Sequence, residues 1–399
     1  MTASAMRLSR RGFIIAGAVL ATTTRLGIAR TLGQASDIDL VSRLGELLAA
    51  VPARDLTVDT PISFYYADLA GQLDALGIRQ LPADRVPDDL PEGFVDATYA
   101  LPLASRAYQF AMTPAWLETF GFSPLAVEQI LEIATPPGII TLFAGGYERD
   151  RVGAALASSG YTEVLQEIGV SYWTFGDDVD LTTSVGQLGG GTMNQAVVSD
   201  DLLIFARQES DIQRVTWTRA GYEPSMLEQG IWTGMMSVFS PDTVGLIPLA
   251  PTELNPAPAS GIPLATPVTV EGRDSGIEYL ALGIRPGGRT AGLALVGEGT
   301  PEPIETPEGT AVPTSVEVRI RYTDPALAER EAAAIPDRWA SMSSLLTGQP
   351  YTDLMTVVDA RVHEEDAQVV AIDFTADVPN VWIRLIHTLD LLPFIPAEG

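Results

Sequence analysis

The spacing of apolar residues over the first 250 positions predicts a mixture of helices and strands. Leucines three or four residues apart predict a helix over residues 38–51. The pair Ser123-Pro124 is typical of a helix start and predicts a helix that runs to about Ala134. Short apolar runs predict strands over residues 62–66, 139–144 and 202–206.

Two stretches of this region share one pattern. The strand over residues 139–144 precedes a helix that ends at Gly160, and the strand over residues 202–206 precedes a helix that ends at Gly221. Both glycines stand where a helix C-cap is expected. Two strand–helix units separated by hairpins are what a ferredoxin-like sheet requires, so we expect repeats of that type.

The C-terminal part reads as strands, a helix, a hairpin and a final helix. Asp324-Pro325 begins a helix that runs toward Leu346, and we expect Pro336 to break or kink it. Strands are predicted over residues 277–284, 291–296, 316–322, 354–362 and 368–374. The final helix carries one apolar stripe, formed by Trp382, Leu385, Ile386 and Leu389. This order indicates an antiparallel sheet with helices on one face.

A proline-rich stretch over residues 251–267 separates these two parts and is typical of a linker. We therefore expect an N-terminal domain over residues 36–250 and a C-terminal domain over residues 268–399. The latter includes an exposed acidic loop over residues 297–313. The expected fold class is α+β, with two modules built on antiparallel sheets that carry helices on one face.

The first 35 residues contain five arginines and no acid. An apolar run over residues 13–21 follows a pair of arginines, and it is too short to cross a bilayer. The segment resembles a twin-arginine translocation signal peptide, whose pattern is Ser or Thr, two arginines, any residue, Phe and an apolar residue. Those places are filled by Ser9, Arg10, Arg11, Phe13 and Ile14.

The resemblance implies that the twin-arginine export machinery is a partner and that the folded chain works beyond the cytoplasmic membrane. Small-residue cleavage sites end at Ala35, which we prefer, and at Ala29. Cleavage of residues 1–35 would leave no stable membrane span. An uncleaved segment that tethers the protein is one alternative, and a core helix with incidental arginines is the other.

Composition excludes several classes of function. The formal charge is −27, so nucleic acids and anionic membrane surfaces are poor partners. Every basic residue except two histidines is arginine, which excludes lysine Schiff bases and a P-loop lysine. The chain has no cysteine, and disulfides, thiol nucleophiles and zinc–thiolate sites are therefore impossible. We expect no cofactor.

The two histidines are weak candidates for chemistry. His363 lies in an acidic turn, where residues 364–366 are expected to favour its protonated form. His387 falls opposite the apolar stripe of the last helix, so we expect it at the surface.

Four other segments have chemical readings that we consider secondary to structural ones. Residues 186–192 could be a glycine loop that binds phosphate, but we expect the tip of a hairpin. Residues 177–180 resemble part of a calcium loop, and residues 272–276 contain an Asp-Ser-Gly turn similar to that around some serine nucleophiles. Trp173 could form an aromatic platform, but we expect it in the core.

No motif in the chain identifies a catalytic, cofactor or metal site. We therefore expect an exported acidic protein with a non-catalytic binding, scaffold or sensing role and an unknown ligand. The alternative is an extracytoplasmic hydrolase that uses only Asp and Glu, for example on saccharides, because the chain contains 51 acids. A calcium protein with oxygen ligands is a third hypothesis.

Overall fold

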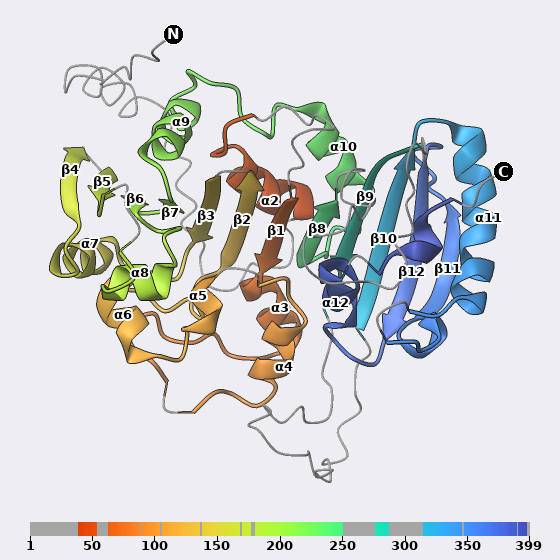
Figure 1. Ribbon diagram of the computed structural model, residues 1–399, viewed down its shortest axis with the longest axis horizontal. Coiled ribbons are helices and arrows are strands. Elements are labelled where there is room, and N and C mark those ends of the chain that lie inside the picture. The colour runs from red at the N-terminus through yellow and green to blue at the C-terminus, as the bar shows by residue number, and fades with distance from the viewer. Residues whose placement is uncertain are drawn as a thin grey trace.

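Figure 1 shows the protein as a computed structural model. It describes residues 39–53, 63–87, 89–103, 106–135, 138–167, 170–176, 180–249, 276–286, 314–344, 347–388 and 390–396. The expected signal peptide with its cleavage sites, the linker over 251–267, the strand over 291–296 and the loop over 297–313 lie outside these residues.

Twelve strands of the described chain belong to one sheet. They are β1 (Ser63–Asp68), β2 (Gln129–Thr135), β3 (Gly138–Ala144), β4 (Thr162–Glu167), β5 (Val170–Thr174), β6 (Gln195–Ser199), β7 (Leu202–Ala206), β8 (Gly245–Leu249), β9 (Ile277–Ile284), β10 (Thr314–Tyr322), β11 (Thr356–Val362) and β12 (Val369–Ala376). Their order is β11-β12-β10-β9-β8-β1-β2-β3-β7-β6-β5-β4, and every neighbouring pair is antiparallel.

Helices cover this sheet. They are α2 (Leu40–Leu48), α3 (Leu69–Ala75), α4 (Phe94–Tyr99), α5 (Arg106–Gln109), α6 (Pro114–Phe120), α7 (Arg149–Ser158), α8 (Ser184–Gly189), α9 (Glu209–Arg219), α10 (Gly230–Ser237), α11 (Pro325–Ser341) and α12 (Val381–His387). Two short 3₁₀ helices, η3 (Tyr351–Asp353) and η4 (Leu392–Phe394), lie near the C-terminal end.

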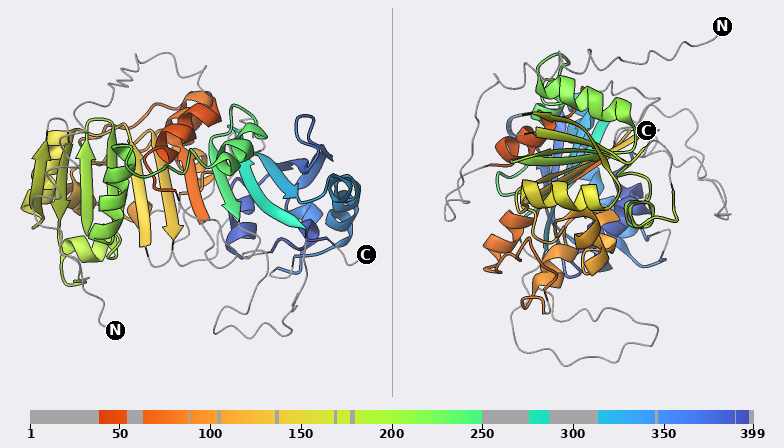
Figure 2. Two further views of the ribbon diagram at one scale, coloured as in Figure 1. Left: turned by 90° about the horizontal axis from the view of Figure 1, so that it is seen from above. Right: turned by 90° about the vertical axis from the view of Figure 1, so that its left-hand side faces the viewer.

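Side chains alternate between the two faces of the sheet, and each face has its own core. On the face that we call the α2 face, α2, α9 and α10 pack against strand residues such as Tyr66, Leu142 and Ile204. On the opposite face, the α12 face, α6 to α8 cover one end of the sheet, whereas α3, α4, α11 and α12 cover the other. Helices therefore flank both faces of the sheet (Figure 2).

The narrowest pairing in the described sheet joins β1 to β8, and we call it the joint. Two residue pairs form it, Tyr66 with Leu246 and Ala67 with Gly245, whereas β1 and β2 share six pairs. The joint divides the sheet into a first strand group, β1 to β7, and a second strand group, β8 to β12. Arg43 of α2 ties the two groups together, because its guanidinium contacts the Asp68 carboxylate at 2.8 Å and donates to the backbone oxygen of Thr243 at 3.0 Å.

The α+β class and the antiparallel pairing are confirmed. The strands of the two expected modules form one sheet, because β8 pairs with β9 on one side and with β1 on the other. Helices on one face were expected for both domains. The helices of the C-terminal part, α11 and α12, both pack on the α12 face, whereas the first strand group has helices on both faces.

The expected ferredoxin-like repeats are wrong. Both strand–helix units exist, as β3 with α7 and β7 with α9, but their strands are antiparallel neighbours and the two helices pack on opposite faces. A ferredoxin-like unit would place both helices on one face.

The helix predicted from Ser123 to Ala134 is also wrong, because residues 129–135 form β2. Ile130 packs against the core on the α12 face and Leu131 against the core on the α2 face. Burial on alternate faces suits a central strand better than a helix. Pro336 lies inside α11 without ending the helix.

No helix in the described ranges combines the length and apolarity that a membrane crossing requires.

Candidate functional site

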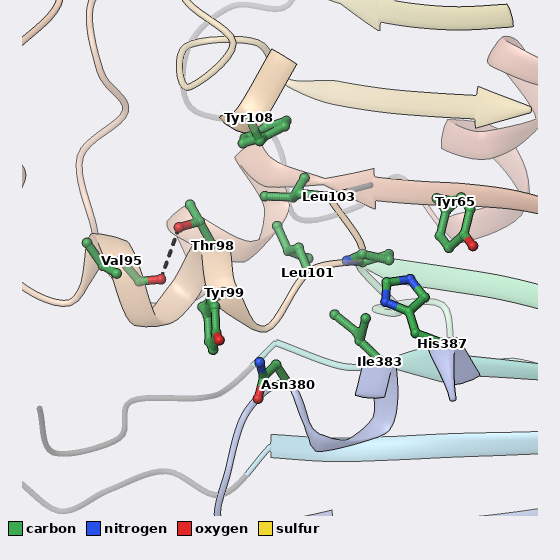
Figure 3. Close-up of a pocket in the computed structure, with 11 residues that line it drawn as sticks. Tyr65, Val95, Thr98, Tyr99, Leu101, Leu103, Tyr108, Asn380, Ile383 and His387 are labelled. Atoms are coloured by element: carbon green, nitrogen blue, oxygen red, sulfur yellow. Dashed lines mark hydrogen bonds between the residues drawn. The ribbon is translucent and has the colours of Figure 1, made fainter. Parts of the chain in front are cut away.

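A pocket of about 290 Å³ opens on the α12 face beside the joint (Figure 3). From β1 and the chain between β1 and β2 come Tyr65, Val95, Thr98, Tyr99, Tyr108 and the segment 101–103. From the C-terminal end of the chain come Asn380, Ile383 and His387. We call this cavity the α4–α12 pocket, and it lies at the lower end of the volume range of small-molecule sites.

Helical periodicity places the side chains of both pocket helices. In α12, Trp382, Leu385 and Ile386 are buried in the core, which leaves Ile383 and His387, four residues apart, to line the cavity. In α4, Phe94 and Ala97 are buried, and Tyr99 remains 50% exposed at the rim.

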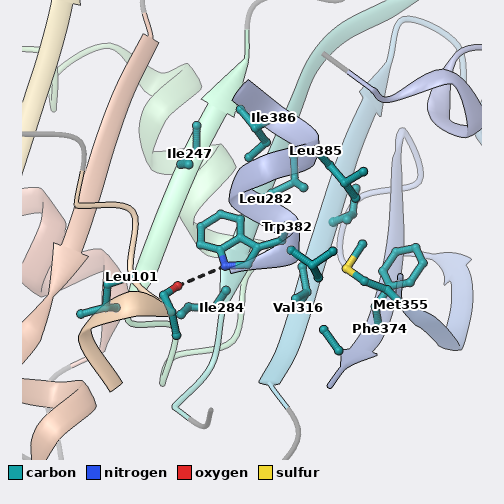
Figure 4. Close-up of a cluster of buried hydrophobic side chains, with 14 of the residues drawn as sticks. Leu101, Ile247, Leu282, Ile284, Val316, Met355, Phe374, Trp382, Leu385 and Ile386 are labelled. Atoms are coloured by element: carbon teal, nitrogen blue, oxygen red, sulfur yellow. Dashed lines mark hydrogen bonds between the residues drawn. The ribbon is translucent and has the colours of Figure 1, made fainter. Parts of the chain in front are cut away.

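The segment 100–103 lies against elements of the second strand group. The indole Nε1 of Trp382 donates to the backbone oxygen of Ala100 at 3.1 Å, as Figure 4 shows. Pro102 packs against Gly245 of β8, where a Cβ atom would lie 2.8 Å from the proline Cδ. Glycine at 245 therefore allows a pocket wall to rest directly on the joint.

Several polar groups of the walls already have partners in the protein. The Tyr108 hydroxyl donates to the backbone oxygen of Pro124 at 2.9 Å, and the Thr98 hydroxyl bonds within its own helix. Asn380 is the N-cap of α12, but its side chain makes no capping hydrogen bond.

His387 is exposed, as predicted, and it also belongs to the pocket. Its ring meets the Tyr65 ring edge to face, with centroids 5.9 Å apart. Partial burial lowers the pKa of His387 below its ordinary value, because the charged imidazolium loses hydration there. The uncharged imidazole is therefore favoured in this position.

His363 differs from its prediction. Partial burial and the nearby Arg319 guanidinium lower its pKa, and these effects outweigh the acidic neighbours that were expected to raise it. The structure places the two histidines in different regions, in the β11–β12 turn and in α12.

The other candidate segments have structural roles or lie outside the described residues. Ser184–Gly189 forms helix α8 rather than a hairpin tip, because Val185 and Leu188 are buried in the core beside α6. Trp173 packs against the same core, as expected. Residues 177–179 and 272–275 are outside the described ranges, and the parts of the chain that are described hold no group of three acidic or histidine side chains able to bind a metal ion.

A charge cluster lies under residues 238–243 on the α2 face. The Arg319 guanidinium contacts the carboxylates of Glu317 at 2.8 Å and Asp373 at 3.0 Å and donates to the backbone oxygen of Val238 at 2.8 Å. Arg319 is 4% exposed and Glu317 is 2% exposed. Because the charged groups of this cluster are paired with one another and with backbone oxygens, we assign the cluster a structural role.

Sequence reasoning did not find the α4–α12 pocket as a site. Its wall residues are ordinary Tyr, Leu, Thr and Asn, and they come from four separate regions of the chain. The one available signal was the placement of His387 off the apolar stripe of its helix. Only the tertiary arrangement shows which residues that histidine faces.

Comparisons with known proteins identify no family. No protein-family model matches the chain, and no curated protein matches it. A search of solved structures finds crystal form I of TP0453, with 8% sequence identity and a TM-score of 0.38 over 86% of this chain and 96% of that one. A likeness this distant transfers no function.

Proposed function

We propose that this chain is an exported, non-catalytic protein that binds a small molecule in the α4–α12 pocket and senses it through the joint. The observation that carries the proposal is the origin of the pocket walls. Tyr65 belongs to β1 of the first strand group, whereas Ile383 and His387 belong to α12, which packs in one core with the second strand group. A bound molecule would contact both.

Contact with both sides provides a physical basis for sensing. A ligand shifts an equilibrium between arrangements by its difference in affinity for them. The joint has the fewest residue pairs of any strand pairing in the described sheet. Small changes in the angle between the strand groups are therefore expected to concentrate there, and a ligand that bridges the walls would favour one angle.

The chemistry of the walls supports binding rather than carboxylate catalysis. Glycoside hydrolysis by acids needs two carboxyl groups about 5–9 Å apart across the bond that is broken. Within the described part of the chain, no Asp or Glu is among the residues that line this pocket. Export is supported by the twin-arginine resemblance of Ser9 to Ile14.

The absence of cysteine makes a direct test of sensing possible. Val164→Cys on β4 and Val358→Cys on β11 would place two spin labels on exposed sites at opposite edges of the sheet. Eleven strand spacings separate these edges, about 50 Å. We expect the electron–electron distance distribution to shift or narrow when N-phenyl-1-naphthylamine or its 8-sulfonate is added to saturation.

A control pair, Val164→Cys with Tyr222→Cys, keeps both labels on one side of the joint and should not respond. An unchanged distribution across the joint with both probes would overturn the sensing role. Turnover of chromogenic glycosides or esters that is lost on a single Asp or Glu substitution would overturn the non-catalytic role.

A further inference from the structure

The walls of the α4–α12 pocket differ in charge from the rest of the molecule. Charged residues make up 19% of the chain, and the formal charge is −27. The described residues that line the pocket nevertheless include no Asp, Glu, Lys or Arg. Among the described lining residues the one histidine is His387, and partial burial lowers its pKa, which favours the uncharged imidazole.

The polar atoms that remain are few and neutral. The cavity has two polar regions, one formed by His387 and Tyr65 and the other by Asn380 and Tyr99 (Figure 3). The apolar side chains of Leu101, Leu103 and Ile383 lie between them. A neutral imidazole offers one donor and one acceptor, and an amide offers both kinds of group. Such walls can orient a ligand through one or two hydrogen bonds while apolar contact supplies the affinity.

We infer that the pocket selects a small uncharged molecule with an apolar body and one or two hydrogen-bonding groups. The inference rests on the proposed binding function and adds the ligand class to it. Among the described wall residues an anion would find no arginine and a cation no carboxylate, so either would lose its hydration without compensation. A saccharide would leave most of its hydroxyl groups against leucine, proline and isoleucine.

Two fluorescent probes that share one ring system test this inference. N-phenyl-1-naphthylamine is uncharged, and its 8-sulfonate carries a single negative charge. We expect the sulfonate to bind the mature protein at least about tenfold more weakly, because the walls, as far as they are described, hold no cation to pair with it. Titration of probe fluorescence at pH 7.5 measures both dissociation constants.

Variants of Tyr99, at the rim of the pocket, test whether the probes bind there. Tyr99→Asp should weaken both probes and the sulfonate most, whereas Tyr99→Arg should reduce the preference for the uncharged probe to about threefold or less. Tyr99 is 50% exposed, so both substitutions are compatible with folding. The matched controls are Tyr222→Asp and Tyr222→Arg, because Tyr222 is 53% exposed and lies outside the pocket.

The outcomes separate the two proposals. If both probes respond to the Tyr99 variants but the sulfonate binds as tightly as the uncharged probe, the ligand class is wrong and the binding site stands. If neither probe distinguishes the Tyr99 variants from the Tyr222 variants, the pocket is not a binding site, and the proposed function fails with the inference.

Discussion

At the scale of single residues, Arg319 shows how a charged side chain is held in the interior. It is 4% exposed, contacts two carboxylates and donates to three backbone oxygens, those of Val238, Val318 and Ile372. The Phe239 ring lies 5.3 Å from the guanidinium carbon. A buried charge is tolerated when its donors are satisfied in this way.

Removal of that guanidinium should therefore be costly. We expect Arg319→Met to lower the free energy of unfolding by about 3–5 kcal/mol, because the Glu317 carboxylate stays buried without the guanidinium that lies closest to it. The double variant Arg319→Met, Glu317→Met should regain part of this loss. Arg361→Met, on an arginine with 45% side-chain exposure, should change it by less than about 1 kcal/mol. Urea unfolding measures all three, and equal effects of Arg319→Met and Arg361→Met would contradict the prediction.

His387 makes a prediction about pH. Its pKa is lower in the folded chain than in the unfolded chain, so protons bind the unfolded chain preferentially and acidification favours unfolding. The wild type should lose stability relative to His387→Gln as the pH falls from about 7.5 through the ordinary histidine pKa to 5. Melting temperatures over this range measure the difference.

The second histidine supplies the comparison for that experiment. The pKa of His363 is also lowered, so the double variant His363→Gln, His387→Gln should show the smallest pH dependence between pH 7.5 and 6. A wild type whose stability rises relative to His387→Gln on acidification would contradict the lowered pKa.

At the scale of elements, Gly245 on β8 sets how closely the pocket wall approaches the joint. A Cβ atom there would lie 2.8 Å from Pro102 and 3.2 Å from Ile284. Contacts this short require either the proline segment or the strand to move. The joint and the pocket wall therefore depend on the same glycine.

A pair of glycine substitutions tests this dependence. Gly245→Ala should lower the free energy of unfolding by about 1–3 kcal/mol through overpacking and should weaken probe binding in the pocket. Gly234→Ala in α10 meets no atom within 4 Å and should raise stability by about 0.5–1 kcal/mol through helix propensity. Chemical unfolding of both variants measures this, and stabilisation by Gly245→Ala would contradict the close approach.

Element type was predictable wherever one face of an element is buried. The stripe at Trp382, Leu385 and Ile386 predicted α12, and alternation over 316–322 predicted most of β10. Sequence reasoning failed at β2 and α8, where a proline turn resembled a helix start and glycines in a buried helix resembled a loop. Which strands pair depends on contacts remote in sequence, and the pocket depends on them too.

At the scale of the whole molecule, both edges of the described sheet have an irregular pairing. The register shifts at Val164 on β4 and at Val358 on β11, and these two valines are 56% and 63% exposed. Bulges on edge strands oppose the addition of further strands. The two edges thus limit growth of the sheet.

The proposed export makes a prediction for the intact chain. Arg10→Lys, Arg11→Lys should retain the full-length protein in the cytosol, because the twin-arginine pattern requires both guanidinium groups. Arg25→Lys leaves that pair intact and is the matched control. Fractionation followed by immunoblotting measures location and size, and export of the double-lysine variant would contradict the signal assignment.

The joint between β1 and β8 also has a mechanical consequence. A pulling force applied between β4 and β11 would act on each strand pairing in series. The pairing with the fewest residue pairs would therefore separate first. Stretched between tethers on those two strands, a single molecule should extend in two steps. The smaller force would mark the parting of the two strand groups, and a molecule in the pocket that bridges them would raise it.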